Sequence, residues 1–255
     1  MPAIDDLSLV ALIWLGGAIF LSGLVHGTLG LGFPLVATPL LALVFDVRTA
    51  IMVTLLPTVV VNVASIIRGG RWSESVGRFW PLALFALAGS VFGTHVLIIS
   101  DPAPFKLLLA ALVLLYLGAT RVRSFSMRWP IAHQGVAMLV FGSIAGLAAG
   151  TTNVMVPILI IYTLELGLAP TAMVQTFNLC FLSGKLSQIA VFATAGLLTT
   201  QLLVGTAPLA LVALVALTLG MAMRARIATD VYRRIVKRVL SVLAVLLIAQ
   251  YFLEG

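Results

Sequence analysis

The segment SGLVHGTLGLGFPLVATP, Ser22–Pro39, lies within hydrophobic sequence of the membrane type and contains residues that interrupt a helix. Gly30, Gly32 and Pro34 stand close together in it, and glycine and proline are the residues least compatible with a continuous helix. We therefore expect the first hydrophobic region of the chain to be broken here, with an irregular turn at membrane depth.

A second segment of this kind follows 118 positions later. When Pro39 is aligned with Pro157, Gly32 falls on Gly150, and GLGFPLVATPLL falls on AAGTTNVMVPIL. Interrupted hydrophobic segments at corresponding places in two halves of a chain indicate the central binding site of a transporter.

The composition places the chain in a membrane. Of its 255 residues, 62% are hydrophobic and 9% charged, and the mean hydropathy is +1.19. Soluble domains carry about 25% charged residues. The net charge of +7 comes from Arg and Lys in short loops between hydrophobic runs, so we expect no nucleic-acid partner. Cys180 is the single cysteine, which excludes an internal disulfide and a CxxC site.

The hydrophobic segments predict an all-α polytopic membrane protein of two inverted repeats, with about five segments each and a short or broken second segment in both. Residues 1–120 form the first transmembrane repeat, residues 121–134 a cytoplasmic inter-repeat loop, and residues 135–255 the second transmembrane repeat. The expected segments are Leu9–His26, Pro34–Phe45, Thr49–Ile67, Phe79–Ile99, Pro104–Thr120, Gly135–Ala149, Asn153–Leu164, Thr171–Thr194, Gln201–Met223 and Arg234–Leu253. The short segments are either full crossings or re-entrant hairpins.

The positive charges predict which loops are cytoplasmic. The basic residues of these loops are Arg68, Arg71, Arg78, Arg121, Arg123, Arg128, Arg224, Arg226, Arg233, Arg234, Lys237 and Arg238. An odd number of crossings per half inverts the second repeat, and the alternation of the charged loops agrees with this. Both termini are then outside.

The broken segments are the first candidate binding site. Backbone groups freed from a helix cannot face lipid, so the turns must be buried or line a wet cavity. Pro34 suits the first turn of a helix, and Thr151, Thr152 or Asn153 suits an N-cap. Both turns would then open helices whose free N–H groups attract an anion. The candidate substrate-binding residues of the two turns are Gly30, Gly32, Phe33, Pro34, Gly150, Thr151, Thr152 and Asn153.

The glycines also have a purely structural interpretation. Gly23/Gly27, Gly89/Gly93 and Gly146/Gly150 are pairs of small residues four apart, a spacing typical of closely packed membrane helices.

Polar residues within the spans extend the candidate site. Lys185 lies near the middle of a long apolar segment, where a charge costs about 2.5–3.5 kcal/mol or more and therefore indicates function. Gln175 and Asn178 share a helical face with Lys185. Alignment of Ala50 with Ala172 places Lys185 on Val63 of the first half, and Asn62 beside it is a further candidate. The alternative is that the Lys185 side chain snorkels to the interface.

His26 precedes the first break by four residues, and an imidazole that titrates near neutrality suits proton coupling. Lys185 is the second proton-coupling candidate. The alternative for His26 is a hydrogen bond between two helices.

The segment GLGFPLVATPLLAL resembles a degenerate form of the G-x-G-G-G-x-x-x-x-P-L-L signature of the sulfite exporter TauE/SafE family. Gly32-Phe33-Pro34 replaces the glycine triplet, and Gly150-Thr151-Thr152 replaces its second copy. The resemblance implies transport, by export in most cases, of small sulfur-containing anions such as sulfite, sulfoacetate and other organosulfonates or thiosulfate.

We therefore expect a secondary transporter in the bacterial inner membrane that works by alternating access on a small anion. Expected partners are this substrate and the lipid bilayer, and a homodimer is compatible with the sequence. No cofactor, metal site or catalytic residue is expected, because the spans lack clustered His, Cys or carboxylates and contain no catalytic motif. The alternatives are a transporter of a carboxylate or a metal cation on the same scaffold, and a passive anion channel.

Overall fold

The computed structural model describes residues 8–70, 72–121, 127, 129–224 and 229–254. Arg71, Arg123, Arg128 and Arg226, which contribute to the charge pattern, lie outside this part of the chain. The described residues form helices and loops, without a strand among them. The helices are α1 Leu9–Leu29, α2 Phe33–Leu41, α3 Val47–Val53, α4 Leu55–Gly69, α5 Val76–Ile99, α6 Ala103–Ala119, α7 Trp129–Ala132, α8 Gln134–Thr152, α9 Val156–Glu165, α10 Pro170–Thr194, α11 Thr200–Arg224 and α12 Thr229–Glu254.

The predicted segments correspond closely to these helices, and the second segment of each half is short, as expected. Helix α2 has 9 residues and α9 has 10. The prediction of one continuous helix over Thr49–Ile67 is wrong, because α3 and α4 meet at Thr54 with a bend of 50°.

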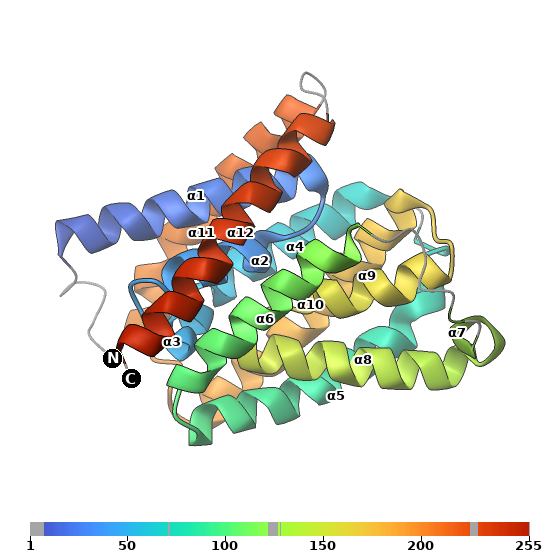
Figure 1. The fold of residues 1–255 in the computed structure, drawn as a ribbon, viewed down its shortest axis with the longest axis horizontal. Helices are drawn as coiled ribbons and strands as arrows, with labels where there is room; N and C mark the ends of the chain where they lie inside the picture. Colours follow the sequence, from blue (N-terminus) through green and yellow to red (C-terminus); the bar gives the residue numbers. More distant parts are fainter. Residues whose placement is uncertain (1–7, 71, 122–126, 128, 225–228, 255) are drawn as a thin grey trace.

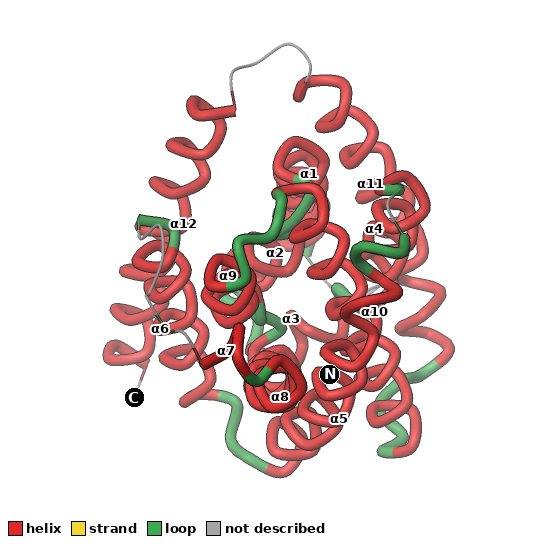
Figure 2. The backbone as a smooth tube through the Cα atoms, turned by 90° about the vertical axis from the view of Figure 1, so that its right-hand side faces the viewer, coloured by secondary structure: helices red, strands yellow, loops and turns green. Residues whose placement is uncertain are grey.

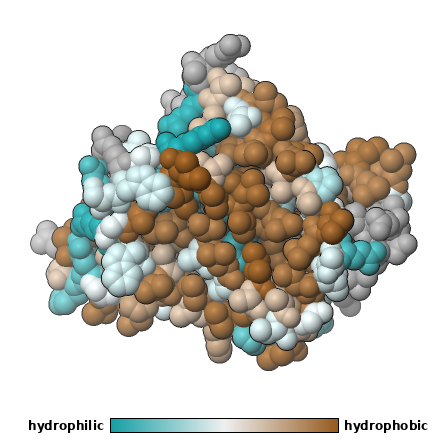
Figure 3. Space-filling model, turned by 180° about the vertical axis from the view of Figure 1, so that it is seen from behind, coloured by the Kyte–Doolittle hydropathy of each residue, from teal (hydrophilic) through white to brown (hydrophobic). Residues whose placement is uncertain are grey.

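Five described helices are long and apolar enough to cross a membrane, and the bent pair α3–α4 makes a sixth. These five are α1, α5, α8, α11 and the Arg233–Leu253 part of α12. Helix α10 has the length of a span, 25 residues, but is more polar. Large apolar side chains are exposed along α5, α11 and α12, and Figure 3 shows apolar residues covering most of one face. Such an exterior suits contact with lipid.

Helices from opposite halves of the chain pack together. Helix α5 lies along α8, and α1 lies along α11 (Figure 1). Helices α6 and α12 lie side by side at one flank, and α4 contacts α10 (Figure 2). The two halves are therefore interleaved in one body.

Glycines allow the closest of these contacts. A Cβ on Gly27 would overlap the Leu217 carbonyl oxygen of α11, and a Cβ on Gly93 would lie 3.1 Å from the Cα of Gly150. A Cβ on Gly220 would likewise lie 3.1 Å from the Cα of Gly27. The packing interpretation of the glycine pairs is thus confirmed, because their missing side chains let backbones touch.

Candidate functional site

The first break is a turn built by two glycines. Helix α1 ends at Leu29, and Gly30 (φ 79°) closes it by donating its N–H to the His26 carbonyl oxygen. Gly32 (φ 102°) precedes α2. Both residues have the left-handed conformation that favours glycine. Pro34 stands in the first turn of α2, as predicted, where its missing N–H leaves no hydrogen bond unmade.

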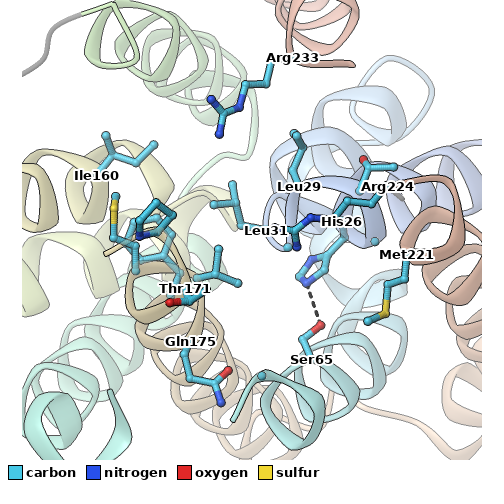
Figure 4. Close-up of a pocket in the computed structure, with 18 of the residues that line it drawn as sticks. His26, Leu29, Leu31, Ser65, Ile160, Thr171, Gln175, Met221, Arg224 and Arg233 are labelled. Atoms are coloured by element: carbon cyan, nitrogen blue, oxygen red, sulfur yellow. Dashed lines mark hydrogen bonds between the residues drawn. The ribbon is translucent and has the colours of Figure 1, made fainter. Parts of the chain in front are cut away.

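His26 joins this turn to α4. Its Nδ1 accepts from the Phe33 N–H at 3.3 Å, so the ring proton of the neutral imidazole is on Nε2. Nε2 lies 3.0 Å from the Ser65 hydroxyl oxygen and donates to it (Figure 4). His26 therefore accepts a hydrogen bond from one of the N–H groups at the start of α2. The Ser65 hydroxyl accepts from His26, so its own proton can be donated to another acceptor.

The second break is built differently from the prediction. Helix α8 continues through Thr151 and Thr152, whose hydroxyls donate to carbonyl oxygens of their own helix, and Asn153 (φ 66°) closes it. Helix α9 begins after Met155 without a side-chain cap. The prediction that Thr151, Thr152 or Asn153 is an N-cap is therefore wrong, since an asparagine adopts the left-handed conformation almost as glycine does and ends a helix in this way.

Asn153 ties the second break to the first half of the chain. Its side-chain amide donates to the hydroxyl of Thr38 on α2 at 2.9 Å and to that of Thr54 at 3.1 Å. All three residues are buried. Gly30 receives a corresponding contact from the second half, because the Asn178 amide donates to its carbonyl oxygen at 3.0 Å.

A cavity of about 530 Å³ opens at the first break and is bounded by α1, α4, α6, α9, α10, α11 and α12 (Figure 4). His26 and the turn Gly27–Leu31 form one wall, with Ser65 of α4 beside them. Gln175 of α10 lies opposite. Polar groups of the helix interior thus reach a space that is large enough for a small solute.

The cavity is strongly basic at its mouth. The cationic residues along it are Arg68, Arg224, Arg233 and Lys237. Figure 4 shows Arg233 extending from α12 toward the centre of the cavity. The described residues that line the cavity include no Asp or Glu. A cluster of positive charges raises the local concentration of anions.

The structure brings only part of the predicted site to this cavity. His26, Gly30 and Gln175 line it, whereas the remaining predicted site residues do not: Gly32, Phe33, Pro34, Asn62, Gly150, Thr151, Thr152, Asn153, Asn178 and Lys185. The Gln175 side-chain amide donates to the carbonyl oxygens of Ile66 and Gly70, which fixes α10 against the end of α4.

Lys185 is enclosed in the helix core rather than extended to an interface. Its side chain is 2% exposed, and its Nζ donates to the Gln188 side-chain oxygen at 2.6 Å. The Gln188 amide donates in turn to the Ala149 carbonyl oxygen near the end of α8. Asn62 is fully buried, and neither its amide nitrogen nor its oxygen has a hydrogen-bond partner among the described residues.

Sequence reasoning missed the cations of the cavity. The residues Arg68, Arg224, Arg233 and Lys237 are recognisable in the sequence only as markers of cytoplasmic loops. Their convergence depends on how α4, α11 and α12 pack, and no motif in the sequence contains that information. No group of three or more His, Cys, Asp or Glu that could hold a metal ion occurs in the part of the chain that the structure describes.

Comparison with known families gives one match. The family model described as sulfite exporter TauE/SafE matches residues 15–249. No curated protein and no solved structure matches the chain.

Proposed function

Because the chain belongs to the sulfite exporter TauE/SafE family, we propose that this membrane transport protein is a secondary transporter that exports a small sulfur-containing anion, such as sulfite or an organosulfonate like sulfoacetate. The observation that carries the proposal is the basic cavity at the first break. It combines four cations, the Ser65 hydroxyl and the Gln175 amide in one space of about 530 Å³.

The positions of the cations support entry from the cytoplasm. Arg68, Arg224 and Arg233 belong to loops that the positive-inside rule assigns to the cytoplasmic side. An anion on that side meets a cavity whose mouth is positive and whose wall carries the Ser65 hydroxyl as a hydrogen-bond donor. Because low-dielectric walls focus the field of such charges, the mouth would concentrate anions before they bind.

The packing of the two halves supports alternating access. The contact of α5 with α8 corresponds to the contact of α11 with α1 in the other half. The contacts of α6 with α12 and of α4 with α10 each join equivalent helices of the two halves. A pseudo-two-fold axis relates helices in this way in transporters built from inverted repeats. Rocking one half against the other would close the cavity on one side and open it on the other.

His26 and Lys185 remain the proton-coupling candidates. His26 lines the cavity, and its Nδ1 accepts from a helix N-terminal N–H that an anion would also seek. Protonation of Nδ1 would free this N–H and would add a positive charge beside the substrate. A proton and an anion would then bind together.

The basic lining also bears on the alternatives. A metal cation would be repelled by four positive side chains, which disfavours this substrate class. A carboxylate would be attracted as a sulfonate is, and a passive channel would need the same charges. A transport experiment must therefore separate these possibilities.

The test uses the purified chain in liposomes that are loaded with sulfite or sulfoacetate. We expect counterflow of the labelled sulfur anion against its gradient, with acetate and nickel unable to replace it. Accumulation against a gradient excludes a channel. Counterflow with acetate but with neither sulfur anion would overturn the substrate assignment.

A further inference from the structure

The two breaks of the chain stand in a constant register of 123 positions. Gly30 and Asn153 both close a helix in the left-handed conformation. Helices α2 and α9 begin at Phe33 and Val156, and each has its proline at the following residue. This register differs from the alignment of Pro39 with Pro157 and places Pro34 on Pro157 instead.

Further features keep the same register. The closely packed glycines Gly23 and Gly27 fall on Gly146 and Gly150, and the cap residue Asp46 falls on Ala169. Hydrogen bonds follow it as well. His26 contacts Ser65 in the first half, and the residues at the corresponding positions, Ala149 and Gln188, are also hydrogen-bonded.

The surroundings of the two breaks differ. Leu29 of the first break and Met221 of α11 line the open cavity. In the register of 123, the counterpart of Leu29 is Thr152. On α5 and α11, Gly93 packs against Gly150 as Gly220 packs against Gly27, so the residues that follow them, Thr94 and Met221, are also counterparts. Thr152 and Thr94 are both fully buried. In the second half, the positions that correspond to these two cavity-lining residues are therefore enclosed.

We propose that this closed region is the outward-facing half of the transport pathway and that Asn153 is its latch. The inference rests on the alternating access of the proposed function. The Asn153 amide bridges the second break to Thr38 and Thr54 of the first half, so the two halves cannot separate here while both hydrogen bonds persist. On the same side, Arg48 donates to the carbonyl oxygens of Leu97 and Ser100 and joins α3 to the end of α5.

The test measures the reaction of single cysteines with a membrane-impermeant thiol reagent. Cys180, the one native cysteine, is buried and is first replaced by alanine. Leu29→Cys and Met221→Cys report on the open cavity, and Thr152→Cys and Thr94→Cys report on the closed one. The hydroxyls of Thr152 and Thr94 donate to carbonyl oxygens of their own helices, so cysteine is a close replacement for them. Val113→Cys, in the core away from the cavity, is the control for unfolding.

We expect Leu29→Cys to react from one side of the membrane and Thr152→Cys from the other. Adding Asn153→Gly retains the left-handed conformation but removes both side-chain hydrogen bonds. It should raise the labelling rates of Thr152→Cys and Thr94→Cys by about tenfold, since the population shifts toward the opposite state. It should lower the labelling rates of Leu29→Cys and Met221→Cys at the same time.

A merely structural role for Asn153 would loosen the protein, and labelling would then increase on both sides or at Val113→Cys. That result would overturn the inference, as would unchanged rates or labelling of Thr152→Cys from the same side as Leu29→Cys. The readout needs no substrate. Failure of counterflow with reciprocal labelling intact would therefore overturn the proposed substrate and leave the latch in place.

Discussion

His26 is the residue on which the first break depends most directly. Removing its ring leaves the Phe33 N–H without its acceptor and Ser65 without its donor. We predict that His26→Ala lowers the free energy of unfolding by about 1–3 kcal/mol, because a buried donor is left unpaired. We also predict that the variant loses the pH dependence of transport, because His26 is the imidazole that lines the cavity.

Transport into liposomes at a series of pH values checks the second part. His95→Ala is the matched control, because His95 is exposed and its ring is hydrogen-bonded to the Val91 carbonyl oxygen of its own helix. A His26→Ala protein with the pH profile of the wild type would remove His26 from the proton pathway.

Lys185 presents a different case, because its amine is enclosed in the helix core rather than placed in the cavity. We predict that Lys185→Met folds but slows transport by about tenfold or more, since an ionisable group within a membrane span indicates function. Thermal unfolding and initial transport rates measure the two effects.

Lys106→Met is the control for Lys185→Met, since Lys106 is also largely buried but lies in α6 away from the cavity. Transport at the wild-type rate by Lys185→Met would show that the amine only holds Gln188 in place.

At the scale of helices, the contact of α1 with α11 depends on glycine. We predict that Gly27→Ala destabilises the protein by about 1–3 kcal/mol, because the added methyl group overlaps the Leu217 carbonyl oxygen and forces backbones apart. Gly17→Ala in the same helix meets no atom within 4 Å and should be neutral or slightly stabilising. Thermal unfolding of the two variants is the comparison, and equal melting temperatures would contradict the close contact.

The helices themselves could be predicted well from the sequence, whereas their relations could not. Hydrophobic length and the Gly30–Pro34 cluster are local signals, and they placed α1, α2 and their break. The end of α8 was misjudged because Asn153 can begin a helix or close one, and only the backbone conformation decides. The 118-position alignment followed sequence similarity around Pro39, but the two breaks and the starts of α2 and α9 follow a register of 123.

The residues of the cavity were predictable where they lie next to the break, as His26 and Gly30 do, or on the polar face of a span, as Gln175 does. Arg233 and Lys237 reach the same cavity from the last helix, nearly the length of the chain away. The positive-inside rule already accounts for their charge, so nothing in the sequence marks them as site residues. Tertiary packing, which the sequence pattern does not encode locally, makes them part of the site.

For the whole molecule, the basic mouth should set how fast anions enter. We predict that Arg233→Gln raises the KM for the sulfur anion by about three- to tenfold and weakens its dependence on ionic strength, because a screened long-range attraction is lost. Arg238→Gln is the matched control, as Arg238 lies on the same helix but does not line the cavity. Equal effects of the two substitutions would mean that only the net charge matters.

The central claim, that the cavity at the first break binds a sulfur-containing anion, is tested most directly by thermal unfolding of the purified protein with sulfite, thiosulfate, sulfoacetate, taurine, acetate, sulfate or nickel. A ligand that binds only the folded state stabilises it by about 2.7 kcal/mol at one hundred times its dissociation constant. We expect a rise in melting temperature with at least one of sulfite, thiosulfate and sulfoacetate, a smaller rise in Arg233→Gln, and an unchanged rise in Arg238→Gln. Stabilisation by acetate or nickel alone, or by none of these three sulfur anions, would contradict the claim.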